Sequence, residues 1–283
     1  MGLEKAVIIL SSEFEILIID NNSDNEFSSH GAIKGKIEDL GIRIIAESNQ
    51  GLTYARLRGI VESCGDYLVF IDDDNVVSSD FLYQGVLVAT NFPFIGAFSG
   101  NVKLIFDEPP ILKLEKYLGL LVRRELSKDE WSNQYFNNST MPCGAGLWIK
   151  KEVASYYVEI NKNGRSNLIS DRIGYALSSG GDNDLAMCAI DIGLGVGLFQ
   201  KLNIEHLITE NRVRENYLLK LNEGIEYSAV ILKFVRAGVL PKSNLKSNLK
   251  NALRIFFSSK IERRFLISSL RGQKKAIAYL NRL

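Results

Sequence analysis

The alternation of apolar and polar residues predicts a chain of short strands and helices. In the first third of the sequence, several apolar runs have the length of buried strands, and each ends in polar residues. Other stretches repeat their apolar residues at helical spacing. The predicted strands are 14–19, 42–46 and 67–71, and the predicted helices are 2–11, 33–40, 52–63 and 80–89. Strands that alternate with helices indicate an α/β fold with a mostly parallel, Rossmann-like sheet flanked by helices.

After residue 95 the pattern is less regular, but it still separates apolar strands from helical segments. The predicted strands here are 97–106, 144–149, 195–198 and 202–204, and the predicted helices are 110–127, 150–157, 180–192 and 215–235. From Pro241 onward the sequence favours one or two basic amphipathic helices. We therefore predict a main domain over 1–240 and a helical extension over 241–283.

The charges change this picture, because an almost neutral total conceals two unlike parts. The 283 residues include 34 Lys and Arg against 33 Asp and Glu, and 46% are hydrophobic, as in ordinary globular proteins. Residues 241–283 contain 11 of the basic residues and a single acid, Glu262, which leaves 23 basic and 32 acidic residues before them. An acidic body with a basic tail excludes a uniformly basic nucleic-acid binder and raises the prospect of an anionic partner for the tail.

Neither the cysteines nor the apolar runs indicate secretion. Cys64, Cys143 and Cys188 are odd in number and widely spaced, which fits reduced thiols better than a disulfide framework or a zinc clip. The start of the chain does not have the pattern of a signal peptide. The longest uncharged run, 81–102, contains Pro and Gly and makes a poor membrane span. We expect a cytoplasmic protein.

Three acidic turns and one histidine carry the candidate chemistry. Asp72, Asp73 and Asp74 follow a predicted strand, where ligands of open α/β sheets bind. Three adjacent carboxylates suit Mg²⁺ or Mn²⁺ shared with substrate phosphates, although an acidic turn that caps the next helix gives the same pattern. The turn after Asp20 could bind a base or ribose or form an Asx turn. Asp182 could be a general base or an N-cap, and His206 a metal ligand or a structural residue.

Taken together, these stretches resemble glycosyltransferase family 2, whose members have the GT-A fold. The resemblance runs from about residue 2 to residue 238. The matching stretches are EILIIDNNSDN, NQGLTYARLRGI, YLVFIDDDNVVSSDFL, CGAGLWIKKEV, SGGDNDLAMCAIDIG and IEHLITENRVRENYLLKL. Two positions depart from the family pattern: Leu57 stands where Asn is usual, and Gly181 replaces Glu.

The resemblance implies a role for individual residues. Those expected at the nucleotide are Asp20, Asn22, Arg56, Asp72 and Asp73. Asp74 and His206 would hold Mg²⁺ or Mn²⁺. Asp182 would be the catalytic base, with Asp184 as the alternative because the Gly181 change leaves the register open. Trp148 would be either a wall of the acceptor pocket or a half-buried core residue.

The resemblance also implies a strand that the sequence lacks. Family members usually begin with a central strand and a Pro-Thr-Tyr-Asn turn, whereas this chain begins in what would be the following helix. We therefore expect an N-terminally shortened domain. Because removal of a central strand would expose two flanking edges, this domain should be less active or inactive unless the strand is replaced.

The implied function is the inverting transfer of a sugar from a nucleotide-diphospho-sugar to a hydroxyl group in polysaccharide, capsule or glycolipid synthesis. The partners would be a UDP-sugar and a saccharide or lipid-linked acceptor, and residues 241–283 would either dock peripherally on an anionic membrane or pack on the acidic body. The alternative is a non-catalytic remnant that binds only nucleotide or a partner. The absence of G-x-G-x-x-G after a strand argues against a nicotinamide enzyme, and the basic residues match no nucleic-acid-binding module.

Overall fold

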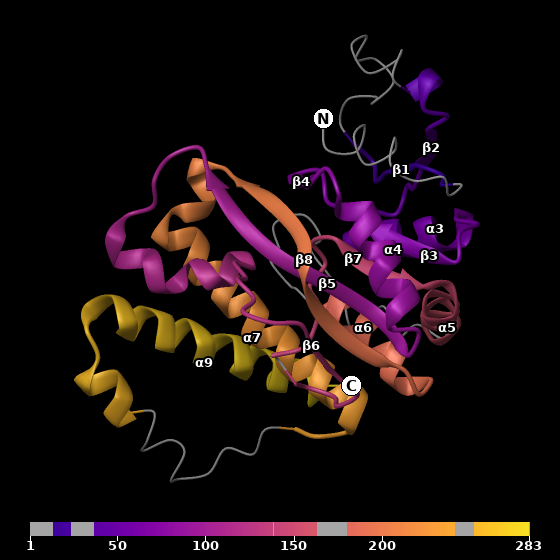
Figure 1. The fold of residues 1–283 in the computed structure, drawn as a ribbon. Coiled ribbons are helices and arrows are strands. Elements are labelled where there is room, and N and C mark those ends of the chain that lie inside the picture. The colour runs from indigo at the N-terminus through magenta and orange to yellow at the C-terminus, as the bar shows by residue number, and fades with distance from the viewer. Residues whose placement is uncertain (1–13, 24–36, 138, 163–179, 241–251, 283) are drawn as a thin grey trace. The chain divides into compact units, whose positions relative to one another are not determined.

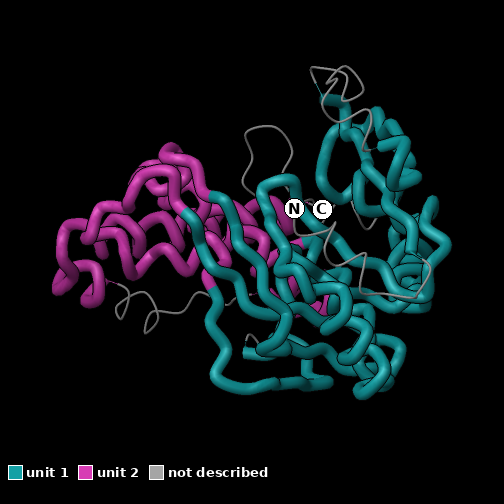
Figure 2. The backbone as a smooth tube through the Cα atoms, turned by 45° about the horizontal axis from the view of Figure 1, so that its top comes forward, with its two compact units in different colours: residues 1–105, 124–166, 181–207 teal, residues 106–123, 167–180, 208–283 magenta. Residues whose placement is uncertain are grey.

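The computed structural model describes residues 14–23, 37–137, 139–162, 180–240 and 252–282 (Figure 1). The predicted helix at 2–11 and most of the one at 33–40 lie outside these residues. The chain forms two compact units (Figure 2). Unit 1 consists of Met1–Ile105, Arg124–Ser166 and Gly181–Leu207, and unit 2 consists of Phe106–Arg123, Asn167–Gly180 and Ile208–Leu283. The segments on both sides of residue 240, where the sequence analysis sets a domain boundary, belong to unit 2.

A two-stranded parallel sheet in unit 1 contains the first predicted acidic turn. Strand β1 (Leu17–Asp20) pairs with β2 (Arg43–Ala46), with Asp20 opposite Ala46 at the carboxyl end. Helix α3 (Leu52–Glu62) follows β2 in the chain and contacts β1, so it packs on this small sheet.

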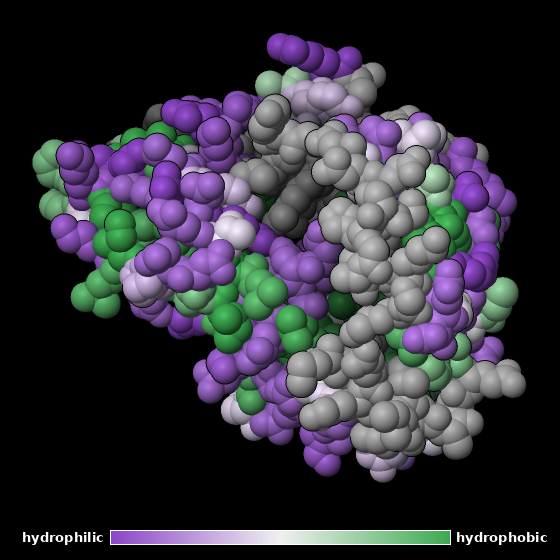
Figure 3. Space-filling view, turned by 90° about the horizontal axis from the view of Figure 1, so that it is seen from above, coloured by the Kyte–Doolittle hydropathy of each residue, from purple (hydrophilic) through white to green (hydrophobic). Residues whose placement is uncertain are grey.

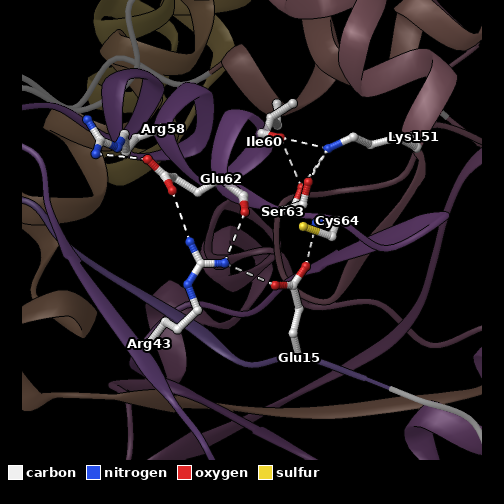
Figure 4. Close-up of polar contacts among 8 residues, drawn as sticks. All are labelled: Glu15, Arg43, Arg58, Ile60, Glu62, Ser63, Cys64 and Lys151. Carbon is white, nitrogen blue, oxygen red and sulfur yellow. Dashed lines mark hydrogen bonds and ion pairs between the residues drawn. The ribbon is translucent and has the colours of Figure 1, made fainter.

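A polar network holds the carboxyl end of α3 (Figure 4). Lys151 Nζ donates hydrogen bonds to the carbonyl oxygens of Ile60 (2.9 Å) and Ser63 (2.5 Å), where a helix presents unpaired acceptors. Arg43 of β2 forms ion pairs with Glu62 (3.0 Å) and Glu15 (3.3 Å). These contacts fix α3 to β2 and to the start of α5 (Lys151–Asn161).

A six-stranded sheet makes up the rest of the unit 1 framework, and its direction of pairing corrects one expectation. The order is β3-β7-β5-β8-β4, with β6 beside β8. The strands are β3 (Tyr67–Phe70), β4 (Asn75–Val77), β5 (Ile95–Phe106), β6 (Glu130–Ser132), β7 (Leu147–Lys150) and β8 (Gly195–Ile208). The α/β class is confirmed. However, β7 runs antiparallel to both β3 and β5, and β8 antiparallel to β4 and β6, so the sheet is not mostly parallel.

The reason for this difference is that β7 lies between β3 and β5. A parallel pair needs a crossover that returns the chain to the adjacent position in the sheet. Here the position next to β3 is taken by a strand that comes much later in the sequence. Strand β8 is also a single 14-residue strand rather than the two predicted short ones, because the exposed Gln200 and Lys201 interrupt its apolar pattern without ending it.

The hydrophobic core of unit 1 lies between the sheet and helix α4 (Phe81–Asn91). Trp148 of β7 is 4% exposed, and its ring stacks on Phe98 with 5.5 Å between centroids. A side chain at Gly85 of α4 would meet this indole at 1.9 Å, so the glycine permits the close approach of helix and ring. The remaining unit 1 helix that bears on the site is α6 (Gly181–Asp191), which contacts α5.

Unit 2 is built on the packing of two long helices, α7 (Glu215–Ala237) and α9 (Lys260–Leu280), with the 3₁₀ helices η2 (Leu112–Leu121) and η4 (Glu210–Val213). Buried Asn222 of α7 donates hydrogen bonds to the Phe265 carbonyl (3.1 Å), the Ser268 hydroxyl (2.6 Å) and the Ser269 hydroxyl (2.9 Å). Within the described residues, no helix is both long enough and apolar enough to span a bilayer.

Candidate active site

The structure brings Asp74 and His206 into contact. Asp74 lies in the turn between β3 and β4, and the register of β4 on β8 places Asn75 opposite His206. The Leu207 N–H donates to the Asp74 carbonyl at 2.8 Å, which locks this register. As a result, His206 Nε2 lies 3.2 Å from Asp74 Oδ2. His206 is buried, with 6% of its surface exposed, whereas Asp74 is half-buried.

The two other carboxylates of this turn face different surroundings. Asp72 is half-buried and its carbonyl accepts a hydrogen bond from the Asn75 N–H at 3.0 Å, whereas Asp73 is exposed. The turn therefore spreads its three acids, and Asp74 is the one that contacts the histidine.

The spacing of the Asp74 oxygen and the His206 nitrogen fits a divalent cation whose remaining coordination positions are filled by a bound ligand. When an oxygen and a nitrogen occupy neighbouring coordination positions of one ion, each lies about 2.1 Å from the ion. The two atoms are then roughly 3 Å from each other. The observed 3.2 Å matches this spacing. Among the described residues, no three His, Cys, Asp or Glu side chains are grouped so that they could hold a metal. Two protein ligands suit Mg²⁺ or Mn²⁺, whose other positions are commonly filled by substrate phosphates and water.

A second contact joins Asp182 to the segment before β7. Asp182 lies in the first turn of α6, and its Oδ2 accepts a hydrogen bond from the Gly144 N–H at 2.8 Å. A Cβ at Gly144 would lie 2.7 Å from Arg56 Nη2 and 3.3 Å from Asp182 Oδ2. The glycine thus allows Arg56 of α3, which is 5% exposed, and Asp182 to meet at one backbone position.

The surroundings distinguish Asp182 from the alternative base, Asp184. Asp182 is partly exposed, whereas Asp184 is only 1% exposed within α6. A general base must lie within hydrogen-bond reach of the acceptor hydroxyl, so the accessible Asp182 suits this role better than the buried Asp184. The neighbouring Cys143 is buried, and this desolvation raises the pKa of its thiol. A protonated thiol is a poor nucleophile.

The turn after β1 presents Asp20 and Asn22. The Ser23 N–H donates to Asp20 Oδ1 at 3.1 Å, and hydrogen bonds from the Ser23 side chain and backbone lower the pKa of Asp20. The exposed Asn22 has a left-handed backbone with φ of 60°. These two residues, which we predict to bind the nucleotide, therefore lie on a separate turn from the Asp74–His206 contact and the Asp182–Gly144 contact.

Asn21, between them, is a residue that the sequence reasoning did not single out. Its Nδ2 donates to the carbonyl oxygens of Glu47 (3.1 Å) and Asn49 (2.7 Å), and its Oδ1 accepts from the Gly51 N–H at 2.6 Å. Gly51 is the N-cap of α3, the helix that contains Arg56. Asn21 therefore ties the Asp20 turn to the start of α3. The Asn at this turn was visible in the sequence, but its partners are 26 to 30 residues away.

The position of Trp148 agrees with one of its two predicted roles. Its ring packs among Phe81, Phe98 and Tyr67 in the core of unit 1, with ring centroids 5.5 to 6.5 Å apart. At 4% exposure this is the core aromatic rather than the wall of an acceptor pocket.

Comparison with known proteins places the chain in a family. A model of Glycosyl transferase family 2 matches residues 5–157, which is more than half of the chain. Two uncharacterized glycosyltransferases, from Rickettsia felis and Rickettsia conorii, are 36% and 38% identical to it over 79 residues. The matched part is 28% of this chain, and the chain covers only 13% of the length of these relatives.

Solved structures show the same fold at low sequence identity. The crystal structure of S. aureus TarS 1-349 superposes with a TM-score of 0.51 and 11% identity, over 100% of this chain and 86% of that one. The structure of the same protein in complex with UDP gives a TM-score of 0.50, also with 11% identity and the same coverage. The family match and these structures confirm the resemblance found in the sequence: the chain belongs to glycosyl transferase family 2 and has the GT-A fold.

Proposed function

We propose that this protein transfers a sugar from a UDP-sugar to a hydroxyl group with inversion at the anomeric carbon. The observation that carries the proposal is the contact of Asp74 with His206, which sets an oxygen and a nitrogen ligand side by side at the end of β3. The complex of TarS with UDP supports a uridine nucleotide as the donor part. Membership in the family favours this transferase over the alternative of a non-catalytic remnant.

Asp74 and His206 would hold Mg²⁺ or Mn²⁺ together with the donor diphosphate. The cation would supply positive charge to the leaving diphosphate. The nucleotide itself would contact Asp20 and Asn22 at the end of β1, as well as Arg56, Asp72 and Asp73. Arg56 suits this role because its guanidinium is a fixed cation with several donors for phosphate or carboxylate oxygens.

Asp182 would act as the general base. Its Oδ2 is oriented by the Gly144 N–H, and the carboxylate remains partly accessible. In the reaction the acceptor oxygen would form a bond to the anomeric carbon while the bond from that carbon to the diphosphate oxygen breaks. The acceptor proton would pass to Asp182, and the electron pair of the broken bond would leave with UDP. Attack opposite the leaving group inverts the anomeric centre, and positioning of the two substrates would provide much of the rate.

The acceptor would be a saccharide or lipid-linked saccharide in polysaccharide, capsule or glycolipid synthesis, and the proposed location is cytoplasmic. These statements follow from the family resemblance.

The proposal is tested by release of UDP from a panel of UDP-sugars with Mn²⁺ or with a chelator. We expect metal-dependent hydrolysis that Asp182→Asn lowers about 10²- to 10⁴-fold, the usual range for a lost general base. UDP binding by Asp182→Asn should be unchanged, because asparagine keeps an oxygen for the Gly144 N–H. Equal hydrolysis by both proteins, or turnover of no UDP-sugar by a chain that binds UDP, would contradict the proposal.

A further inference from the structure

The short helix at 252–257, just before α9, presents an apolar face that no described residue covers. Leu253, Phe256 and Phe257 are 50%, 73% and 80% exposed, and their spacing of three and four residues places them on one side of the helix. The two phenyl rings contact each other edge to face, with 5.2 Å between centroids. On the face shown in Figure 3, hydrophilic residues predominate among those described, and hydrophobic ones lie in separate groups. A pair of adjacent, largely exposed phenylalanines is a concentrated apolar feature for a protein surface.

The basic residues of α9 itself are largely engaged within unit 2. Arg264 pairs with Glu215 at 2.5 Å, and both Arg271 (3.6 Å) and Lys275 (2.5 Å) pair with Glu223 of α7. Because their charges meet acids of the neighbouring helix, they contribute to the packing of α9 on α7. Arg264, Arg271 and Lys275 therefore fit the packing interpretation of the basic tail, and any docking role falls to the residues before them.

The helix at 252–257 is held firmly against the start of α9. Arg263 donates from Nε to the Ile255 carbonyl at 3.1 Å and from Nη2 to the Phe256 carbonyl at 3.4 Å, which satisfies the carboxyl end of the short helix. Ser259 and Glu262 form a capping box at the start of α9. The phenylalanines are therefore presented on a braced support, which lowers the ordering cost of docking.

Two exposed cations lie near this face in the sequence, Arg254 on the short helix and Lys260 at the start of α9. Within the described residues neither takes part in an ion pair. Exposed phenylalanines beside such cations match the chemistry of an anionic lipid surface, whose headgroups attract the charges and whose acyl boundary accepts the rings.

We propose that Leu253, Phe256 and Phe257, with Arg254 and Lys260, form a docking surface for an anionic lipid bilayer. This goes beyond the proposed catalysis, which needs no membrane for hydrolysis of the donor in solution. The sequence analysis assigned the membrane surface to the whole of 241–283, and the proposal restricts it to the short helix at 252–257 and Lys260. The occupant is a bilayer, and a second copy of this chain is an alternative that the experiment separates.

The test is co-sedimentation of the full chain with vesicles of phosphatidylcholine alone and of phosphatidylcholine mixed with phosphatidylglycerol. We expect binding to the mixed vesicles, a fall of about tenfold or more for the double variant Phe256→Ser/Phe257→Ser, and no change for Leu112→Ser. Leu112 is the matched control, since it is 85% exposed in the same unit. Arg254→Gln/Lys260→Gln and added salt should each weaken binding to the mixed vesicles.

Each contrary result overturns the proposal. These results are no binding by the unchanged chain, equal binding to both kinds of vesicle, or equal binding by the phenylalanine variant. A change of molar mass in light scattering without lipid, caused by the double serine variant alone, would assign the face to a second copy. The double variant should keep its hydrolysis of the donor in solution, so loss of docking and loss of the proposed catalysis are distinguishable.

Discussion

Asp74 Oδ2 and His206 Nε2 lie 3.2 Å apart although 132 residues separate them in the chain. The contact depends on antiparallel pairing of β4 with β8, which sets Asn75 opposite His206. It would not arise if the sheet were parallel at this point, because β8 would then need a different register and direction. The part of the sheet that departs from the sequence prediction is therefore the part that assembles the proposed cation ligands.

We expect His206→Ala to weaken UDP binding in the presence of Mn²⁺ by at least about tenfold, since loss even of an outer partner of a metal site costs 10- to 100-fold. Binding with a chelator present should be unchanged, because the substitution removes a ligand of the cation and not a contact to the nucleotide. Isothermal titration under both conditions measures the two affinities.

The control for this variant is Glu205→Gln. Glu205 is the preceding residue on β8, is exposed, and pairs with Lys103 at 3.3 Å. It should bind UDP with Mn²⁺ as the unchanged chain does. If both variants behave alike, or if His206→Ala loses affinity equally with the chelator, His206 does not serve a cation.

Asn21→Ala should lower both stability and nucleotide affinity. The side chain makes three hydrogen bonds to the backbone of 47–51, and each such bond contributes about 1 kcal/mol. Because the site is only half-buried, water can partly replace the lost hydrogen bonds. We expect a loss of about 1–2 kcal/mol in the free energy of unfolding, and weaker UDP binding because the Asp20 turn is no longer tied to α3.

Asn49→Ala is the matched control for Asn21→Ala. Among the described residues the Asn49 side chain bonds locally to Glu47 at 2.9 Å, and its carbonyl remains available to Asn21 after the substitution. Urea denaturation and titration with UDP give both quantities. Full affinity in Asn21→Ala despite lower stability would mean that the turn is placed independently of this residue.

The sequence predicted the α/β class and most of the helices because their apolar spacing reflects which face is buried. Phe81 and Val88 of α4, for example, recur at helical spacing and are both buried. The direction of β7 could not be predicted in this way. Its short apolar run looks the same in either direction, and its place between β3 and β5 is decided by contacts distant in sequence.

From the sequence, the candidate site could be proposed only residue by residue. Asp74, Asp182 and His206 could be selected by residue type and position, but not the partners that orient them. The Gly144 N–H, which orients Asp182, is 38 residues away from it in the chain. The Gly51 N–H, which Asn21 binds, is 30 residues away from Asn21. Trp148 illustrates the opposite limit, because an aromatic residue after Gly-Ala-Gly gives the same pattern whether it lines a pocket or fills the core.

Gly85→Ala should destabilise unit 1. The new methyl group would lie 1.9 Å from Cζ2 of Trp148, and that buried ring is already stacked on Phe98. The gain in helix propensity, about 1 kcal/mol, is smaller than the strain of overpacking, so we expect a net loss of about 1–3 kcal/mol. Gly119→Ala, whose methyl would meet nothing within 4 Å, should cause no comparable loss in thermal or urea unfolding. Equal midpoints for the two variants would show that the indole can move aside.

The pair of Lys116 and Glu262 should give unit 2 a specific acid sensitivity. The hydrogen bond from Lys116, together with those from Ser259, lowers the pKa of Glu262 from an ordinary 4.5 to about 2. A carboxyl group with a lower pKa in the folded chain stabilises the fold at higher pH, and this contribution is lost as the pH falls through the folded value. The contribution of Glu262 is therefore complete above about pH 4.5 and disappears as the pH falls toward 2.

Glu262→Gln removes this titration while its side-chain oxygen can still accept from the Ser259 N–H, so the capping box is kept. We expect the urea midpoint of the unchanged chain to fall more steeply between pH 4.5 and 2 than that of the variant. The effect should be small and should shrink in high salt, because the pair is exposed to solvent. Ser259→Ala provides the contrast, since it weakens the cap but leaves the ion pair. Parallel pH profiles for the unchanged chain and Glu262→Gln would contradict a role for this carboxylate in acid stability.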